Sequence, residues 1–548
     1  MTNVEELLQY LDKSKVVVTT LDETPETVIQ TFKPTTHQQD KLNELKEWYY
    51  SDSLFIVLDG AAGTGKTSII DCFISNVVGG RKKIVLIAPT HKALNVVRPK
   101  INSNCEFITN ASAIGMRPDD NLEKYDPTKT EFIIKANRAI EEYDIAINDE
   151  GSMIPAVVIE ALEQSAIKEK IKILYIADEV QLPAVGEYIS AVFKYPRITL
   201  TEIIRQKNTH PLTYLLAVMR ENILDLIYDR VTINNVKYEW INILNQNSKV
   251  INEFEEGYCC ISYDNIENYI HIFEEDKFTS KYLTFANKDV LKTNRIIRNR
   301  LYPNSTKFVE IGELFMAYST ISDDKLRYKL TNSIDYLITD IAESSLFFKN
   351  VIVENKKYNF KTEILQYDEK GDIEIKGYKA TIQSEENNRI ITQTIFIPNK
   401  DSYNTIGKEH VKYHNDNNIG VRWQMKPFYG SYKEFRSKLT LITDIFKDSI
   451  EFKHYDNTGS LLKIISKDLD RAYSITKHKS QGSTYKNTIV NIKETLDYLK
   501  LSIDPNVFYK RYGRAITDID IKNEITFHLR LIYVALSRVT KISYIIIK

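Results

Sequence analysis

One glycine-rich segment constrains the fold of this chain more than any other feature. Residues 60–67 read GAAGTGKT, which fits G-x-x-x-x-G-K-[ST], and they lie between the apolar run LFIVLD and the helical run SIIDCFI. A strand, such a turn and a helix form a phosphate-binding loop, because the glycines let backbone N–H groups face the phosphate and the helix N-terminus adds its dipole. We expect Lys66 to reach the β- and γ-phosphates of a nucleotide, and the Thr67 hydroxyl to bind Mg²⁺. The predicted nucleotide-binding residues of the loop are Gly60, Ala61, Ala62, Gly63, Thr64, Gly65, Lys66 and Thr67.

Apolar, strand-like runs alternate with helical stretches from about residue 35 to about residue 205. This alternation is typical of a doubly wound parallel sheet. A second α/β region begins near residue 282 and resumes near residue 472. Between about 316 and 469, short alternating stretches separated by polar turns predict a β-rich insertion.

Two carboxylates and a glutamine follow strand-like runs downstream of the glycine-rich segment. Asp149 and Glu150 come directly after residues 144–148. In this context we expect Asp149 to hold Mg²⁺, through water, and Glu150 to polarise the attacking water. Gln181 follows the run 173–177. It is either a sensor of the γ-phosphate or an ordinary polar residue of a loop, and the residues alone do not decide between the two.

Composition bounds the class of protein without naming a function. The chain has 548 residues, which exceeds one compact core, so we expect about three or four domains. Apolar residues make up 43% and the net charge is −1, so the chain is an ordinary globular protein without a globally basic surface. It contains no apolar run of about 20 residues, and its acidic N-terminus does not resemble a signal peptide. Its four cysteines lack metal-binding spacing, which predicts a reducing, cytoplasmic location without structural disulfides.

Seven segments, taken in order, resemble motifs I, Ia, II, III, IV, V and VI of the superfamily 1 helicases. The spellings of the last two resemble the 5′→3′ branch, which includes RecD-like enzymes and Dda-type phage helicases. Two weaker matches, 109–115 and 285–288, extend the resemblance, which covers about residues 35–315 and 470–548. The sequence departs from the family pattern at Ala111, where the family has His, and at Gly151, where many relatives have Val or Ala. The segments are the P-loop, APTHKAL (88–94), DEGSM (149–153), ADEVQLPAVGE (177–187), LTEIIRQ (200–206), ITKHKSQGST (475–484) and YVALSRV (533–539).

The resemblance implies roles for further residues. Either Gln38 or Gln39 would read the adenine edge, since two adjacent glutamines leave the register open. Arg205 and Arg538 would act as arginine fingers on the γ-phosphate, because each offers a permanently charged planar fork. Gly482 and Gln481 would couple closure of the nucleotide cleft to the track. The residues expected along the single strand are Pro89, Thr90, His91, Thr109, His478 and Lys479.

The same resemblance implies an α/β fold with two RecA-like motor domains. We expect motor domain 1 at 33–205, motor domain 2 at 206–315 and 470–548, an extension at 1–32, and a β-rich insertion domain at 316–469. A pin-like hairpin that splits the duplex is expected near 117–137. Phe132 would be its aromatic face, or else a strand residue that packs the hairpin.

These expectations describe an ATP-dependent 5′→3′ DNA helicase that uses ATP and Mg²⁺. Its partners would be single-stranded DNA and forked duplex, with replication or single-strand-binding proteins as further candidates. It would act as a monomer and would not bind a membrane. The Lys-, Ile- and Asn-rich composition suggests an AT-rich genome such as that of a phage, so the location could be a host cytoplasm. An alternative is a translocase or clamp that remodels nucleoprotein without processive unwinding. A degenerate nucleic-acid-binding protein is disfavoured because the catalytic residues are intact, and the preference for DNA over RNA stays open.

Overall fold

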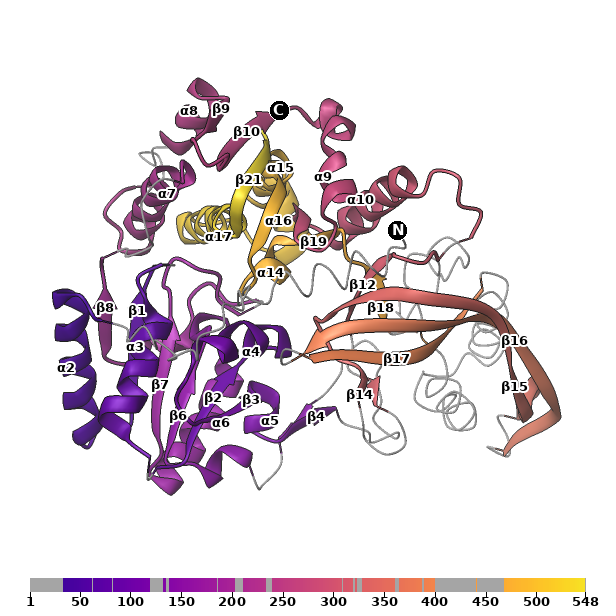
Figure 1. The fold of residues 1–548 in the computed structure, drawn as a ribbon, viewed down its shortest axis with the longest axis horizontal. Coiled ribbons are helices and arrows are strands. Elements are labelled where there is room, and N and C mark those ends of the chain that lie inside the picture. Colours follow the sequence, from indigo (N-terminus) through magenta and orange to yellow (C-terminus); the bar gives the residue numbers. More distant parts are fainter. Residues whose placement is uncertain are drawn as a thin grey trace, which may run out of the picture. The chain divides into compact units, whose positions relative to one another are not determined.

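The computed structural model divides the chain into two compact units, which are described separately (Figure 1). The larger unit comprises 29–115, 135–303 and 473–548, and the smaller unit comprises 1–28, 116–134 and 304–472. The structure describes residues 33–61, 63–80, 82–118, 132–134, 138–184, 186–202, 210–232, 239–307, 309–318, 321–322, 328–359, 364–386, 389–399, 440 and 468–547.

The first sheet of the larger unit is parallel throughout and has six described strands. Its four inner strands β2, β6, β7 and β1 are almost entirely buried, which explains why they consist mostly of Ile, Leu, Val and Ala. The strand order is β3 (Glu106–Thr109), β2 (Ile84–Ala88), β6 (Ile145–Asn148), β7 (Lys172–Ala177), β1 (Phe55–Gly60) and β8 (Arg197–Leu200). The accompanying helices are α2 (Thr36–Tyr50), α3 (Lys66–Phe73), α4 (His91–Val97), α5 (Asn110–Ala113) and α6 (Ala156–Glu169).

The second sheet repeats the topology of the first. When the parallel strands of each sheet are renumbered by their order in the chain, the first sheet reads 3-2-4-5-1-6 and the second reads 3-2-4-5-1. An antiparallel strand, β9, closes the far edge of the second sheet. The strand order is β19 (Ser474–Thr476), β11 (Ser280–Thr284), β20 (Tyr485–Asn491), β21 (Val539–Ile546), β10 (Gly257–Ile261) and β9 (Lys249–Ile251). The predicted α/β fold with two RecA-like sheets is therefore confirmed.

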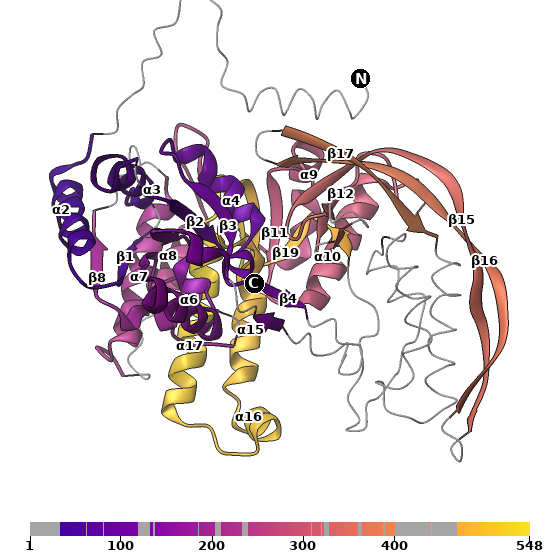
Figure 2. The ribbon, with the colours of Figure 1, turned by 90° about the horizontal axis from the view of Figure 1, so that it is seen from below.

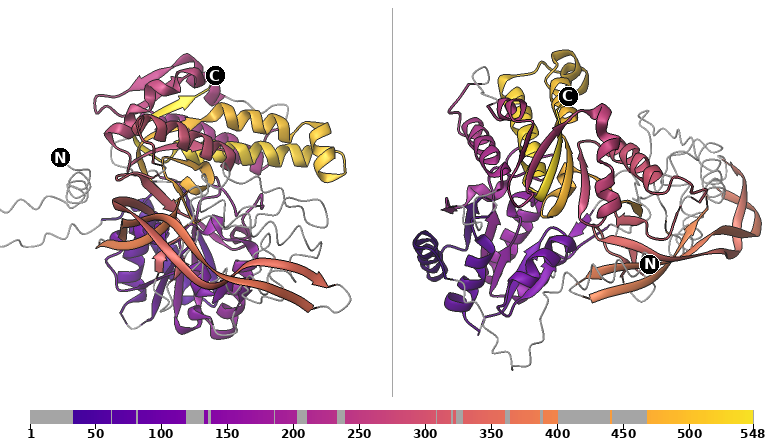
Figure 3. Two further views of the ribbon diagram at one scale, coloured as in Figure 1. Left: turned by 90° about the vertical axis from the view of Figure 1, so that its right-hand side faces the viewer. Right: turned by 45° about the horizontal axis from the view of Figure 1, so that its top comes forward.

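Helices between residues 212 and 536 pack around the second sheet. Helices α15 and α17 run side by side, with the short α16 at one end of the pair (Figures 2 and 3). Helix α7 also packs along α17. The helices are α7 (Leu212–Ile227), α8 (Glu239–Gln246), α9 (His271–Glu275), α10 (Asn287–Leu301), α14 (Lys477–Ser480), α15 (Ile492–Ser502), α16 (Pro505–Tyr512) and α17 (Asp518–Leu536).

The smaller unit contains an antiparallel sheet, which confirms the predicted β-rich insertion. Two long strands, β15 and β16, form a curved ribbon (Figure 1). The sheet order is β17 (Arg389–Pro398), β16 (Ile364–Glu386), β15 (Asp335–Asn359), β12 (Leu314–Ala317) and β18 (Leu469–Arg471). The domain boundaries given above stay a prediction.

Two short strand pairs complete the smaller unit. Strand β4 (Met116–Pro118) pairs antiparallel with β5 (Phe132–Ile134), within the segment where a hairpin is predicted. Strand β13 (Ile321–Ser322) pairs with β14 (Tyr328–Leu330). Among the described residues of the whole chain, no helix is both long and apolar enough to cross a membrane.

Candidate functional site

The phosphate-binding loop joins strand β1 to helix α3 as the sequence predicts. Gly63 and Gly65 have φ of +87° and +82°, a left-handed conformation that side chains with a Cβ disfavour. A Cβ on Gly65 would also lie 2.5 Å from Nε2 of Gln38. Glycine at position 65 is thus required both by the backbone conformation and by the close approach of a neighbouring side chain.

Gln38 fastens the loop to helix α2. Its side chain is 1% exposed; its Nε2 donates to the backbone oxygen of Thr64 (3.2 Å), and its Oε1 accepts from the backbone N–H of Thr35 (3.1 Å). Gln39 is exposed and donates to Asn43 instead. Neither glutamine lines the cavity described next, so adenine recognition by one of them stays a prediction. The role of Gln38 in holding the loop was not predicted.

A cavity of about 340 Å³ brings together most of the predicted catalytic residues. Lys66, Thr67 and the neighbouring loop residues Ala61, Gly63 and Gly65 line it. Gly60 and Thr64 do not, because Gly60 ends strand β1 and the buried Thr64 hydroxyl donates to the Ala61 carbonyl. Ala62 and Arg205 lie outside the described residues. The lining residues from both sheets include Lys66, Thr67, Lys100, Asp149, Glu150, Asp178, Gln181, Gly482, Thr484 and Arg538.

Asp149 and Glu150 enter the cavity from the end of strand β6. Burial, followed by the charge of Glu150, raises the pKa of Asp149 to about 6, while Lys66 and Lys100 oppose the shift. Glu150 has φ of +53°, a strained conformation for a residue with a side chain. At the next position, a Cβ on Gly151 would meet the Ile176 carbonyl oxygen at 3.1 Å. The departure from the family pattern at Gly151 therefore matches the tight space beside strand β7.

The donor set fits a nucleotide with its metal ion. Nζ of Lys66 donates to the carbonyl oxygens of Gly60 and Ala61 (3.0 Å to the latter), so the ammonium is held at the loop where phosphate oxygens would bind. The Thr67 hydroxyl and the Asp149 carboxylate are hard oxygen donors in the same cavity. Within the described ranges, no three His, Cys, Asp or Glu side chains could hold a metal by themselves. Mg²⁺ bound with a nucleotide needs only one or two protein oxygens, so these two suffice.

Gln181 is tied to both sheets. Its Nε2 donates to Oδ2 of Asp178 (3.2 Å), and its Oε1 accepts from Nε2 of Gln481 (3.2 Å). Gln181 and Gln481 are 7% and 8% exposed, and they come from the two different sheets. Asp178 and its partner Arg220 were not predicted as functional residues. Asp178 lies inside a motif and was a visible candidate, whereas no local signal marks Arg220.

Arg538 and Gly482 reach the cavity from the second sheet. Arg538 is 8% exposed, and its Nε donates to the Val534 carbonyl (3.1 Å) at the end of α17. Gly482 has φ of +72°, and a Cβ there would lie 3.6 Å from Oε1 of Glu150. Residues of the second sheet thus lie next to the predicted catalytic carboxylate.

Three threonines cap helices that begin at strand ends. Thr90, Thr109 and Thr476 each accept a hydrogen bond from the backbone N–H three residues on. Thr109 and Thr476 end β3 and β19, the strands at equivalent edges of the two sheets. Such helix N-termini can bind phosphate groups. Thr476 was not predicted; its signal is the same threonine cap seen at Thr109.

The remaining nucleic-acid candidates differ in their surroundings. Pro89 and His91 are half-buried beside Thr90, and burial, followed by Arg98, lowers the pKa of His91. His478 packs on Phe527 with ring centroids 5.5 Å apart, and burial lowers its pKa to about 4.

The two lysines beside His478 differ in burial. Lys477 is fully buried and donates to the Asn491 carbonyl, whereas Lys479 is half-buried.

The backbone of Phe132 pairs with that of Pro118, and its side chain lies outside the described part of the chain. Both interpretations of Phe132 therefore stay open.

Comparisons with known proteins agree with the motifs. A family model described as an AAA domain matches residues 36–234. An uncharacterized protein of Acanthamoeba polyphaga mimivirus is 25% identical over 533 residues, covering 88% of this chain and 98% of that protein. The ATP-dependent DNA helicase dda of Enterobacteria phage T4 is 24% identical over 269 residues, covering 48% of this chain and 55% of that protein. The chain therefore spans less than two thirds of the T4 protein.

Solved Pif1 helicases resemble the whole chain at low sequence identity. The structure from Bacteroides with ADP-AlF3 and single-stranded DNA has a TM-score of 0.43 and 15% identity, over 93% of this chain and 92% of that one. The structure from Candida albicans has a TM-score of 0.42 and 14% identity, over 94% of both chains. At these scores the assignment depends on the motifs and the sequence relatives. The seven ordered motifs, the cavity that most of them line and the matched AAA domain make this chain similar to the superfamily 1 helicases, among which the phage T4 relative is an ATP-dependent DNA helicase.

Proposed function

We propose that this chain is an ATP-dependent 5′→3′ DNA helicase that moves along single-stranded DNA and unwinds duplex. The observation that carries the proposal is the cavity of about 340 Å³ lined by both sheets. Lys66, Asp149 and Glu150 come from one sheet and Arg538 from the other. Hydrolysis at such a site depends on how the second sheet is held against the first, which is what a motor requires.

The nucleotide would occupy only the first sheet. Strand β10 of the second sheet takes the place of β1, but the residues after it read SYDNIENY and contain no glycine loop. Lys66 would release the carbonyls of Gly60 and Ala61 and turn to the β- and γ-phosphates. Thr67 and Asp149 would hold Mg²⁺, which supplies charge neutralisation for the transferred phosphoryl group.

Chemistry at the γ-phosphate would use three side chains of this chain. Glu150 would accept the proton of the attacking water, and Gln181 would orient that water. Arg538 would place its guanidinium on the charge that develops at the phosphoryl oxygens. Because Arg538 and Gln481 belong to the second sheet, hydrolysis and product release would change the contact between the sheets.

The bound single strand of nucleic acid would cross equivalent edges of the two sheets. Thr109 at the β3 edge, Thr476 at the β19 edge and Thr90 after the neighbouring strand β2 would place the starts of the short helices that they cap near backbone phosphates. Contacts of this kind carry no sequence information, so binding should be salt-sensitive and nearly independent of sequence. Pro89, His91, His478 and Lys479 lie beside these caps and would complete the grip.

The choices of DNA and of 5′→3′ polarity depend on the family spelling and on one relative. The phage T4 relative is named an ATP-dependent DNA helicase. The segments ITKHKSQGST and YVALSRV resemble the 5′→3′ branch. Unwinding itself would need a rigid group at the fork, for which Phe132 in strand β5 is the candidate.

Strand displacement on tailed substrates tests the proposal. Duplexes with a 5′ tail, a 3′ tail or no tail, each in DNA and in RNA, are mixed with the protein, ATP and Mg²⁺. We expect displacement from the 5′-tailed DNA alone, together with ATP hydrolysis stimulated by single-stranded DNA. Displacement from the 3′-tailed duplex alone contradicts the polarity. Stimulated ATPase without any displacement favours a translocase or clamp, and absence of stimulation contradicts the motor assignment.

A further inference from the structure

The Asp178 carboxylate joins the predicted sensor to a half-buried arginine, Arg220. Oδ2 of Asp178 accepts from Nε2 of Gln181 (3.2 Å), and its Oδ1 accepts from Arg220 (2.6 Å) and from the Val180 backbone N–H (3.2 Å). Asp178 is 2% exposed. Burial alone would raise the pKa of Asp178, but the charges of Arg220 and Lys66 keep it below its ordinary value. The carboxylate is therefore ionised and can only accept hydrogen bonds.

This contact fixes which end of the Gln181 amide faces the cavity. A carboxylate accepts but does not donate, so the NH₂ group of Gln181 must face Asp178. The oxygen end then points away, where it accepts from Gln481 of the second sheet. The orientation of the sensor amide thus depends on the position of Asp178.

Arg220 connects that carboxylate to the helices that carry the arginine finger. Arg220 lies on α7, which packs along α17, and its charge partly offsets the rise that burial causes in the pKa of Tyr533 on α17. Arg530 of α17 donates to the backbone oxygens of Glu179 (2.8 Å) and Tyr188 (2.6 Å). Helix α17 ends just before Arg538. The pair α7–α17 therefore grips the loop after β7 while it also carries Arg538.

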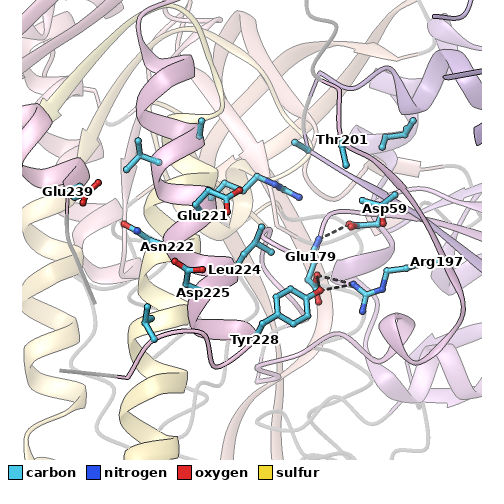
Figure 4. Close-up of a pocket in the computed structure, with 17 residues that line it drawn as sticks. Asp59, Glu179, Arg197, Thr201, Glu221, Asn222, Leu224, Asp225, Tyr228 and Glu239 are labelled. Carbon is cyan, nitrogen blue, oxygen red and sulfur yellow. Dashed lines mark hydrogen bonds and ion pairs between the residues drawn. The ribbon is translucent and has the colours of Figure 1, made fainter. Parts of the chain in front are cut away.

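A neighbouring arginine provides a contrast. Arg197 and Tyr228 bind the Glu179 carboxylate at the wall of a separate cavity of about 930 Å³ (Figure 4). The Arg197–Glu179 distance is 2.9 Å, similar to that of the Arg220–Asp178 pair. No hydrogen bond connects the Glu179 side chain to Gln181 within the described residues. The two ion pairs hold adjacent residues of one loop, but only one of them reaches the sensor.

We propose that Arg220 is a positioning residue for ATP hydrolysis, which fixes Asp178 and thereby holds the Gln181 oxygen where it can accept a hydrogen bond from the attacking water. The inference rests on the proposed function, since it assigns Arg220 a part in that same reaction. It makes the sensor respond to helix α17, so that the finger and the sensor move as one set. Arg220 does not line the cavity of about 340 Å³ in which the nucleotide would bind.

The test compares Arg220→Met with the matched control Arg197→Met. Each change removes a guanidinium that binds a carboxylate of the loop after β7. At saturating single-stranded DNA, we expect Arg220→Met to lower the kcat of ATP hydrolysis by about 10²-fold, because small misplacements of a catalytic group cost that much. The KM for ATP should change by less than about twofold, since ground-state binding is untouched. Arg197→Met should change neither by more than about twofold, and equal losses in the two variants would overturn the proposal.

A double-mutant cycle with the sensor separates positioning from general damage. If Arg220 acts through Gln181, adding Arg220→Met to Gln181→Ala should lower kcat no further. Independent effects would multiply instead, which would refute the mechanism. Comparison of the wild type and Gln181→Ala first establishes that the sensor contributes.

A conservative variant covers loss of folding. Removing Arg220 leaves the Asp178 charge uncompensated, so the melting temperature of Arg220→Met is measured alongside activity. Arg220→Lys keeps the charge but loses the planar fork that binds Asp178. It should fold and show reduced kcat with unchanged KM, whereas wild-type kcat in this variant would overturn the proposal. Lack of DNA-stimulated ATPase in the wild type would instead refute the proposed function.

Discussion

Replacing Gly65 by alanine tests how the phosphate-binding loop is built. The left-handed backbone at φ +82° costs a residue with a Cβ about 1–2 kcal/mol. The new Cβ would lie 2.5 Å from Nε2 of Gln38, which must move and give up its bond to the Thr64 carbonyl. Losing that bond costs about 1 kcal/mol more. We therefore expect Gly65→Ala to destabilise the larger unit by about 2–3 kcal/mol in total.

Gly513→Ala is the matched control for this prediction. Gly513 has the same left-handed conformation as Gly65 (φ +69° and ψ +13°, against +82° and +21°), but nothing lies within 4 Å of the position that its Cβ would take. It should cost only the backbone part, about 1–2 kcal/mol. Denaturant titration of both variants gives the difference in stability, and ATP titration of hydrolysis gives KM, which should rise in Gly65→Ala alone. Equal stability and an unchanged KM in the two variants would refute the reasoning about the Gln38 contact.

Three further substitutions test the proposed chemistry. Lys66→Ala should abolish ATP hydrolysis while single-strand binding without nucleotide survives, because the phosphates lose their fixed counter-ion; steady-state ATPase near the wild-type rate would contradict the P-loop assignment. Arg538→Ala should bind ATP but hydrolyse it about 10³-fold more slowly in single-turnover assays; loss of nucleotide affinity with normal turnover of bound ATP would make Arg538 a binding residue. Phe132→Ala should reduce duplex unwinding and spare DNA-stimulated ATPase, since an aromatic face replaces about 1–3 kcal/mol of base stacking at a fork; a fall in melting temperature with parallel loss of both activities would indicate packing instead.

The sequence predicted the residues that line the cavity better than the contacts that hold these residues in place. Lys66, Asp149 and Arg538 stand in motifs whose spelling carries their identity, and all three line one cavity. Local order cannot show that Arg220 meets Asp178, because 42 positions separate them and only the packing of α7 brings them together. The adjacent residues Gln38 and Gln39, and the residues Lys477 and Lys479 two positions apart, show a similar limit. Which member of each pair is buried depends on the helix face that packs against the sheet.

Topology likewise exceeded what periodicity could show. Apolar runs predicted parallel strands, but the shared order 3-2-4-5-1 of the two sheets depends on crossovers between distant segments. The hairpin near Phe132 was predicted from the family rather than from alternation, and only its two strands are described. Arg205 and Ala62 lie outside the described residues, so their roles also stay predictions.

The pairing of β12 with β18 has a consequence for how this chain could have arisen. These strands open and close the long insertion, and they lie side by side: Ala317 faces Leu469, and the Tyr318 N–H donates to the Asp468 carbonyl (2.8 Å). Neighbouring strands are about 4.8 Å apart, so the insertion of about 150 residues begins and ends at almost the same point in space. The entropy of closing such an excursion grows only with the logarithm of its length. The length of the insertion therefore has little effect on the stability of the two RecA-like sheets. Related proteins could carry a longer, shorter or different insertion without changes to the ATPase site.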